Sequence, residues 1–447
     1  MTYPKNFVWG SATSSYQIEG AISEDGKGLN IWDIFCMQQG KIADNTSGKI
    51  ACDHYHRIDE DVALIKNLGI SAYRFSLSWA RLLPEGDGAI NQKGFDFYNK
   101  LIDSLLESGV TPWITFYHWD LPAALQDRGG WTNPDCHKWF SSYAETATGK
   151  FSDRVKNFFL LNEPSVSCFE GHLTGAHAPG LKTKESYIKA VHQHNMAVKH
   201  GYHAVKSVGN DLNVGSTFTY FPVRPAMENA PKYTHARDMM DCLWNRAYLD
   251  PLMKGQYPEM IANDVTEICG PVEDMKTPLD FVGLQHYCPS YAHPNNGNDY
   301  GCNFGPPPGN PDLTDMGWPI EAGAFSECLI EFKQKYGSID LYITENGCAM
   351  PDKRDANGQV HDPRRIKYFE EYLQAMQDAM ASGVDIKGYF IWSMFDNFEW
   401  AYGLEKRFGV VHVDYDNNLI RTPKDSYRWW QTYLASLEEQ NDLRSCG

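Results

Sequence analysis

The sequence lacks long hydrophobic runs. No stretch of its 447 residues approaches the length and apolarity of a membrane span, and the first ten residues, MTYPKNFVWG, contain no apolar core of signal-peptide length. We therefore expect no transmembrane segment and no secretion signal, and we expect the protein to be cytoplasmic. A glycine-rich phosphate loop and a nucleophile elbow are missing as well, which argues against nucleotide-binding enzymes and serine hydrolases.

Cysteine pairs at metal-binding or redox spacing are also missing. The 11 cysteines are odd in number and no two lie three positions apart, which excludes the usual zinc and redox motifs. Scattered cysteines are typical of a reducing compartment. We predict no metal and no cofactor.

Positive charge is in short supply. The chain has 40 Lys and Arg residues against 57 Asp and Glu residues, and its net charge is −17 at pH 7. Because an acidic surface repels phosphate groups and anionic lipids, we expect neither nucleic acid nor a membrane as a partner. An acidic cleft suits neutral or cationic small molecules, and composition does not indicate the oligomeric state.

Aromatic residues are abundant by contrast, with 13 Trp, 25 Tyr and 22 Phe. Most of them are expected to fill the core. A second interpretation is a sugar site, because the C–H face of a pyranose ring packs flat against an indole ring. Composition alone does not distinguish the two.

Short apolar segments alternate with helical patterns along the whole chain. The predicted strands are 7–12, 71–78, 111–118, 157–162, 212–218, 279–287, 340–346 and 387–393. The clearest helices are predicted at 59–69, 95–109 and 362–383, each ending at a glycine. The Pro- and Gly-rich segment 301–312 is predicted to be a long surface loop.

Eight strands alternating with helices predict an α/β fold, a single (β/α)8 TIM barrel spanning residues 1–447, whose long βα loops form an active-site cleft. A doubly wound open sheet is the alternative, and the missing phosphate loop disfavours it. In a barrel of this kind the active site lies at the carboxyl ends of the strands.

Polar and aromatic side chains gather at or near those predicted strand ends. They are Gln17, Arg74, His118, Trp119, Asp120, Asn162, Glu163, Gln285, His286, Tyr287, Glu345, Asn346 and Trp392. Because the carboxyl ends of parallel strands meet at one rim, these residues are expected to converge although they are scattered along the sequence.

Two of the strand ends carry a glutamate next to an asparagine. Paired carboxyl groups across a pocket are the arrangement that cleaves glycosidic bonds. With the carboxyl groups about 5–5.5 Å apart, Glu345 attacks the anomeric carbon while Glu163 protonates the leaving oxygen. Arg74 is the cation suited to keep Glu345 ionised. Alternatively, each glutamate simply stabilises the first turn of a helix, which explains one such residue more easily than two.

Several segments, taken together and in order, resemble glycoside hydrolase family 1, the β-glucosidase type. They are FVWGSATSSYQIEGA, YRFSLSWARLLP, FYHWDLP, LNEP, GHLTGAHAPG, LYITENG, GYFIWSMFDNFEW and KRFGVVHVDY. LNEP alone is a weak signal, because other barrel glycosidases share it, but the ordered set covers nearly the whole chain. The resemblance implies a retaining β-glucosidase that hydrolyses terminal β-D-glucosyl residues of β-glucosides and short oligosaccharides such as cellobiose, as in cellulose degradation.

Carried over position by position, the resemblance implies that Glu163 is the acid/base and Glu345 the nucleophile. The implied sugar-binding residues are Gln17, His118, Trp119, Asn162, Trp392 as the floor, Glu399, Trp400 and Phe408, with Trp318 on the leaving-group side and Arg74 and Tyr287 holding the nucleophile. Bidentate hydrogen bonds from such groups distinguish the orientations of sugar hydroxyls, because a wrong orientation leaves a buried polar group unpaired.

Three positions depart from the family pattern. Gln285 and His286 stand where the family usually has Asn-Tyr, and Ser165 replaces a bulky aromatic after the LNEP segment. The segment after Trp318 lacks the usual Pro-Glu-Gly. The first change affects the surroundings of the nucleophile, and the other two affect the leaving-group side, which we expect to be wider than usual.

Two other functions are less compatible with the sequence. A 6-phospho-β-glycosidase of the same family would carry Ser at the position of Glu399 and Tyr at that of Phe408, with a lysine at Lys406. A carboxylate at position 399 would repel a sugar phosphate. A non-catalytic sugar-binding relative could lose either catalytic glutamate, but both are present. The histidines of the helical segment 190–206 are interpreted as surface or half-buried residues, because no HExxH arrangement accompanies them.

Overall fold

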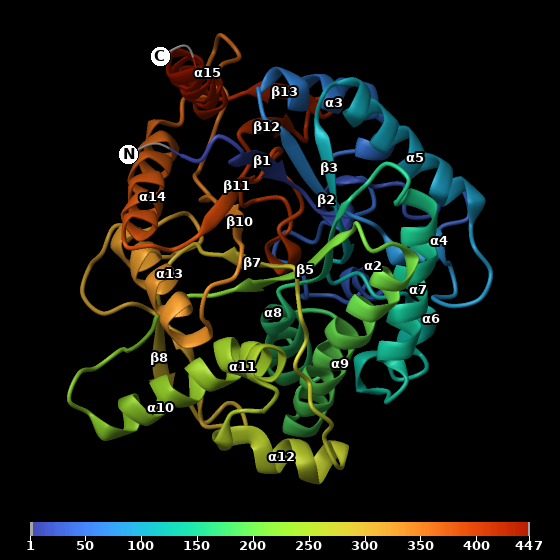
Figure 1. Ribbon diagram of the computed structural model, residues 1–447, viewed down its shortest axis with the longest axis vertical. Helices are drawn as coiled ribbons and strands as arrows, with labels where there is room; N and C mark the ends of the chain where they lie inside the picture. Colours follow the sequence, from blue (N-terminus) through green and yellow to red (C-terminus); the bar gives the residue numbers. More distant parts are fainter. Residues whose placement is uncertain (1–2, 446–447) are drawn as a thin grey trace.

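The computed structural model describes residues 3–445, and their side chains up to residue 439. Eight parallel strands close into a barrel in which β1 pairs with both β2 and β11 (Figure 1). The barrel strands are β1 (Val8–Ala12), β2 (Ala72–Ser76), β3 (Thr111–Tyr117), β4 (Asn157–Asn162), β5 (Asn213–Thr219), β7 (Phe281–Gln285), β10 (Leu341–Asn346) and β11 (Ile386–Trp392). The predicted (β/α)8 barrel is therefore confirmed, and every predicted strand corresponds to one of the barrel strands.

Helices surround the barrel on the outside (Figure 1). The longer ones are α3 (Ile58–Asn67), α5 (Gln92–Glu107), α7 (Cys136–Phe151), α9 (Lys184–Val208), α10 (Pro231–Asp241), α11 (Ala247–Lys254), α12 (Glu259–Cys269), α13 (Ala322–Tyr336), α14 (Pro363–Ala381) and α15 (Asp425–Ser445). The helices predicted from the sequence correspond to α3, α5 and α14. The glycine that follows each has a positive φ, a backbone conformation that stops a helix at little steric cost.

Shorter helical turns occupy the connections. They are α1 (Ser15–Ile18), α2 (Ile31–Cys36), η1 (His54–His56), α4 (Trp79–Leu82), α6 (Ala123–Gln126), η2 (Gly130–Thr132), α8 (Pro164–Cys168), η3 (Phe169–Thr174), η4 (Cys242–Arg246) and η5 (Trp400–Tyr402). Of these, η3 and η4 are π-helical. No helix within residues 3–445 is long and apolar enough to cross a membrane.

The barrel interior is packed with aromatic side chains. Trp113, Phe159, Phe281 and Phe390 form its centre, and their rings contact one another. Gly10 provides the room, because a Cβ atom there would lie 2.3 Å from the ring of Phe390. A larger apolar cluster fills the layer between the barrel and its helices. Most aromatic residues therefore serve the core, as the composition predicted.

Two small sheets lie outside the barrel and were not predicted. One contains β6 (Val223–Pro225), β8 (Ser290–Pro294) and β9 (Cys302–Gly305), and the other contains β12 (Val411–Asp414) and β13 (Ile420–Pro423). Strand β9 lies inside the segment 301–312, so the prediction of an uninterrupted loop there was wrong. The composition of this segment is typical of turns, but antiparallel pairing with β8 supplies the hydrogen bonds that make Cys302–Gly305 a strand. Only the part after Gly305 is irregular.

Candidate active site

A cavity of about 670 Å³ opens at the carboxyl ends of the barrel strands. Ten residues predicted to form the site line it: His118, Trp119, Glu163, Tyr287, Trp318, Glu345, Trp392, Glu399, Trp400 and Phe408. The other three, Gln17, Arg74 and Asn162, are buried behind this wall and bonded to residues in it. The fold thus brings together side chains that are up to 391 positions apart in the sequence, from Gln17 to Phe408. We call this the central cavity.

The end of β4 delivers two adjacent side chains to the same place. Neighbouring residues of a strand normally point to opposite faces. Glu163, however, has a φ of 45°, in the left-handed region, and it caps the short helix α8. This change of direction places its carboxyl group beside the amide of Asn162, with Asn162 Nδ2 donating to Glu163 Oε2 over 3.3 Å. Trp119 and Trp400 also have positive φ values, of 76° and 49°. Such strained conformations cluster at functional sites.

At the end of β10 the register with both neighbouring strands shifts, and the two side chains go to different places. Glu345 points into the central cavity, whereas Asn346 points away and donates from Nδ2 to the carbonyl oxygen of His286 over 2.6 Å. Its Oδ1 accepts from the hydroxyl of Tyr389, also over 2.6 Å. The two glutamate–asparagine pairs that appear equivalent in the sequence therefore differ: Asn162 supports the site and Asn346 holds the strand end in place.

Two donors hold Glu345. Arg74 Nη1 donates to Oε1 over 2.6 Å, and the hydroxyl of Tyr287 donates to Oε2 over 2.6 Å. Burial raises the pKa of Glu345, while Arg74 and Tyr287 lower it. Both of its oxygen atoms thus accept strong hydrogen bonds that favour the ionised form.

Glu163 lies in a different electrostatic environment. Its one hydrogen-bond donor among the described side chains is the neutral amide of Asn162, and none of their cations pairs with it. Burial raises its pKa well above the ordinary value, and the negative charge of Glu345 raises it further. Glu345 therefore loses its proton before Glu163 does. Glycoside cleavage needs one ionised carboxylate and one protonated carboxylic acid at neutral pH, and these two environments provide both.

Asn162 connects the surroundings of the two carboxyl groups through its hydrogen bonds. Its Oδ1 accepts from Arg74 and, over 2.8 Å, from Gln285 Nε2. Its Nδ2 approaches His118 Nε2 to 3.0 Å. Burial and the charge of Arg74 lower the pKa of His118 well below its usual range, so the ring is neutral. Gln285 is buried outside the cavity wall, so its extra methylene, compared with the usual asparagine, serves to reach Asn162.

A third carboxyl group lines the cavity on the loop between β11 and β12. Gln17 Nε2 donates to Glu399 Oε2 over 3.4 Å and to the carbonyl oxygen of Phe398 over 3.0 Å. Burial, followed by the charge of Glu345, raises the pKa of Glu399 to about 8. Glu399 can therefore both donate and accept hydrogen bonds near neutral pH.

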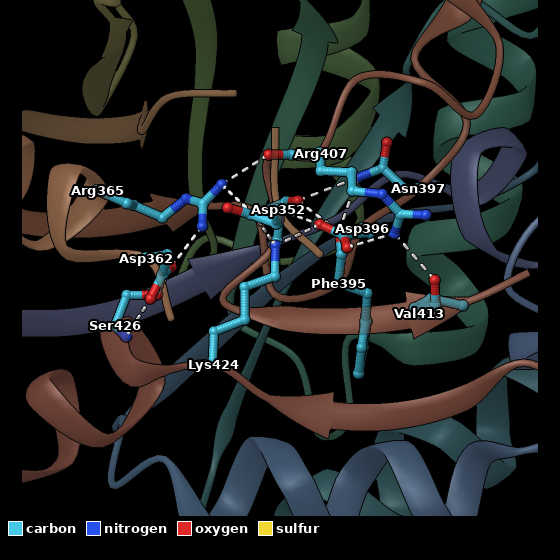
Figure 2. A network of polar contacts seen from close by, with 12 residues as sticks. Asp352, Asp362, Arg365, Phe395, Asp396, Asn397, Arg407, Val413, Lys424 and Ser426 are labelled. Carbon is cyan, nitrogen blue, oxygen red and sulfur yellow. Dashed lines mark hydrogen bonds and ion pairs between the residues drawn. The ribbon is translucent and has the colours of Figure 1, made fainter. Parts of the chain in front are cut away.

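Buried ion pairs fix this loop from behind (Figure 2). Lys424 Nζ, fully buried just before α15, donates to Asp396 Oδ1 over 2.7 Å and to Asp352 Oδ2 over 2.6 Å. Arg407 Nη1 contacts the other oxygen of Asp396 over 2.9 Å. Arg365, from α14, joins Asp352 over 2.6 Å. The loop that carries Glu399 is thus tied to two outer helices.

Aromatic rings complete the wall. Trp392 lies at the top of the barrel interior, and its ring stacks beside His118 with centroids 5.9 Å apart and planes 20° apart. Trp119 and Trp400 contact each other at 4.5 Å. Gly347 permits the tight turn after β10, because a Cβ atom there would lie 1.8 Å from the carbonyl oxygen of Trp392.

The outer part of the cavity contains residues that the sequence did not reveal as site residues. They are Val166, Glu170, Ala176, His177, Thr219, Phe221, Trp244, Cys288, Pro289, Ser290, Tyr291, Phe304, Gly305, Pro306, Pro307, Leu313, Met316, Gly317, Pro319, Ala401 and Tyr402. They come from irregular loops, from β8 and β9, from the end of β5 and from the short helical segments α8, η3, η4 and η5, where no long periodic pattern marks an inward face. Ser165 is buried and does not line the cavity; its neighbour Val166 does. Its effect on the width of the leaving-group side is therefore indirect.

The histidines of α9 lie away from this cavity. His194 is fully buried, where it approaches Cys168 Sγ at 3.3 Å, and His200 is within 3.3 Å of Glu273. The expectation of surface or half-buried positions was thus wrong for His194, because α9 packs its face against α7 and β4. Residues 3–445 contain no cluster of three or more His, Cys, Asp or Glu side chains arranged to hold a metal ion.

A parallel eight-stranded barrel with paired, electrostatically distinct carboxyl groups inside an aromatic wall defines a glycoside hydrolase. Comparison with known proteins agrees. The sequence profile of Glycosyl hydrolase family 1 matches residues 1–439. The chain belongs to this family, as the sequence motifs predicted.

Similarity to individual members extends over nearly the whole chain. β-Glucosidase A of Acetivibrio thermocellus is 42% identical over 451 residues, covering 98% of this chain and 99% of that protein. The solved structure of a family 1 β-glucosidase from Thermotoga maritima superposes with a TM-score of 0.92 at 40% identity, covering 98% and 99% of the two chains. The same enzyme has been solved in complex with isofagomine lactam, where the TM-score is 0.91.

Proposed function

We propose that this protein is a retaining β-glucosidase that removes terminal β-D-glucosyl residues from β-glucosides and short oligosaccharides such as cellobiose. Glu345 attacks the anomeric carbon while Glu163 protonates the leaving oxygen. Water, activated by Glu163 as a base, then cleaves the glycosyl-enzyme ester. Residues 1–447 act as one catalytic domain.

The observation that carries the proposal is the unequal treatment of the two buried glutamates. Glu345 receives one hydrogen bond from Arg74 and one from Tyr287, each of 2.6 Å. Glu163 receives one longer bond, from a neutral amide. Because burial penalises both charges, only the carboxylate with the stronger donors stays ionised, and the other is available as the acid.

The first sugar is expected to lie over Trp392. Glu399 and His118 are proposed to bind its hydroxyl groups, because both line the cavity and His118 stacks beside Trp392. Gln17 lies behind Glu399 and donates to its carboxyl group, and it is proposed to bind the same sugar. Asn162 supports the 2-hydroxyl position, and Trp119, Trp400 and Phe408 enclose the ring. Trp318 faces the leaving group. Similarity to β-glucosidases A of Acetivibrio thermocellus and Thermotoga maritima supports this assignment over other glycosides.

A sugar phosphate is not the expected substrate. The carboxyl of Glu399 lines the cavity, and ionised it would repel a phosphate. Lys406 Nζ is engaged by Asp315, donating to its carbonyl oxygen over 2.8 Å and to its carboxylate over 3.2 Å. Since both catalytic glutamates are present and well placed, a purely sugar-binding role is not supported either.

We also infer that the protein acts in the cytoplasm on small molecules, consistent with a role in cellulose breakdown after uptake. Support comes from the ten described cysteines, which are all free. The net charge of −17 supports the expectation that nucleic acid and membranes are not partners.

The test of the function is chemical rescue. Glu345→Gly should lose nearly all turnover of an activated aryl β-glucoside, and azide should restore cleavage with formation of the α-glucosyl azide. Glu327→Gly, on the exposed side of α13, is the control and should keep its activity without azide. Near-native turnover by Glu345→Gly, or a β-azide product, would contradict the proposed mechanism.

A further inference from the structure

A fourth carboxyl group, Glu170, lines the central cavity together with Glu163, Glu345 and Glu399. It lies on η3, a short π-helical segment that directly follows the helix capped by Glu163. The mechanism does not use it. A half-buried carboxyl group in an otherwise apolar part of a wall requires an explanation, because desolvating it is costly.

Glu170 is held in place but not neutralised. Thr174 Oγ1 donates to its Oε2 over 2.6 Å, and the backbone carbonyl of Glu170 accepts from His177 N over 3.0 Å. Burial raises its pKa, and Thr174 is the neighbour that lowers it; no cation contributes. Its Oε1 atom makes no hydrogen bond to any residue in the range 3–439.

Glu170 lies on a different part of the cavity wall from Glu399, because it belongs to η3 whereas Glu399 belongs to the loop between β11 and β12. The charge of Glu345, after burial, raises the pKa of Glu399, whereas burial is what raises the pKa of Glu170. Tyr402 lines the cavity as well, and burial, followed by the charges of Glu399 and Glu170, raises its pKa. The cavity wall also contains the apolar side chains of Val166, Phe221, Trp244 and Phe304. Phe169, the residue before Glu170, contacts the rings of Trp244 and Phe304, with centroids 5.6 and 6.3 Å away.

A fixed acceptor on an apolar, aromatic wall suits a ring that presents hydroxyl donors and C–H faces. We propose that Glu170 accepts a hydrogen bond from a hydroxyl of the second sugar of a β-linked disaccharide and so selects neutral sugars as leaving groups. This inference rests on the proposed β-glucosidase function. An aryl leaving group without donors gains nothing from Glu170.

The test compares substrates that share the first sugar and differ in the leaving group. Glu170→Leu should lower kcat/KM for cellobiose by roughly ten- to a hundredfold, since a hydrogen bond to a charged group is lost, and should leave p-nitrophenyl β-glucoside within about threefold. Glu170→Gln keeps an acceptor and should fall between wild type and Glu170→Leu on cellobiose. Equal losses on both substrates, or none on cellobiose, would overturn the inference.

Binding separates this inference from the proposed function. In a Glu163→Gln background, titration calorimetry should show that Glu170→Leu weakens cellobiose but not glucose, in the same proportion as kcat/KM. A wild type that binds cellobiose in this way without hydrolysing any glucoside would refute the proposed function and leave the role of Glu170 intact. Equal cellobiose affinity with and without Glu170→Leu, or no cellobiose binding at all, would refute the role of Glu170.

Discussion

Replacing Tyr287 by phenylalanine removes one of the two donors to Glu345 and keeps the aromatic ring. The ring contacts Trp318 at 5.4 Å and Phe408 at 6.0 Å, so packing is preserved. The hydroxyl favours the ionised form of Glu345, and its loss must therefore raise the pKa of this carboxyl group. A hydrogen bond to a charged group contributes about 1.5–3 kcal/mol, which corresponds to about one to two pKa units.

The assay is the pH dependence of kcat/KM for an activated aryl β-glucoside, whose acidic limb reports the group that must be ionised in the free enzyme. In Tyr287→Phe this limb should move to higher pH by about one to two units. Tyr372→Phe is the matched control, because the hydroxyl of Tyr372 donates to the backbone carbonyl of Tyr287 and not to the carboxylate. An unmoved acidic limb in Tyr287→Phe, or an equal shift in the control, would refute this account of Glu345.

Three further predictions concern Glu163, Lys424 and Gly347. Glu163→Gln should slow substrates with poor leaving groups by about 10²–10⁴-fold and activated ones far less, measured as kcat with a series of aryl glucosides. Lys424→Met should lower the free energy of unfolding in urea by about 3–5 kcal/mol at pH 7, because it leaves buried carboxylates unpaired. Burial alone would raise the pKa of Asp396, but Lys424 and Arg407 hold this pKa below its usual value. The contribution of the Asp396 ion pairs to the free energy of unfolding is therefore complete above about pH 4 and is lost as pH falls further. Gly347→Ala should reduce kcat about 100-fold, because the added Cβ atom displaces the backbone of Trp392 and with it the indole ring, whereas Gly323→Ala, which meets nothing within 4 Å, should not.

Much of the fold could be predicted because it depends on local patterns. Each of the eight barrel strands is a short apolar run, and α3, α5 and α14 are followed by glycines, so the alternation was visible without tertiary information. Parallel order then placed Glu163 and Glu345 at the same rim. The five strands outside the barrel could not be predicted, because segments such as β9 have no apolar alternation of their own and form through pairing with β8.

The direction of individual side chains was the other limit. The sequence presents Asn162 and Asn346 alike, yet only the first supports the cavity, because the left-handed conformation of Glu163 reverses the usual alternation at β4. The position of Glu170 in the cavity wall could not be predicted from the sequence, because η3 is π-helical and its inward face follows no regular period. Resemblance to the family likewise gave no reason to expect a carboxyl group there.

Covalent trapping of the glycosyl-enzyme ester can show whether Glu345 is the nucleophile. The wild type would be incubated with 2-deoxy-2-fluoro-β-glucosyl fluoride, digested and analysed by mass spectrometry. A fluoro substituent destabilises the oxocarbenium-like transition states, while fluoride is a good enough leaving group for the ester to form and persist. If Glu345 is the nucleophile, we expect time-dependent inactivation and one labelled peptide, with the fluoroglucosyl group on Glu345. A label on Glu163, on Glu399 or on no residue of an inactivated enzyme would contradict this role of Glu345.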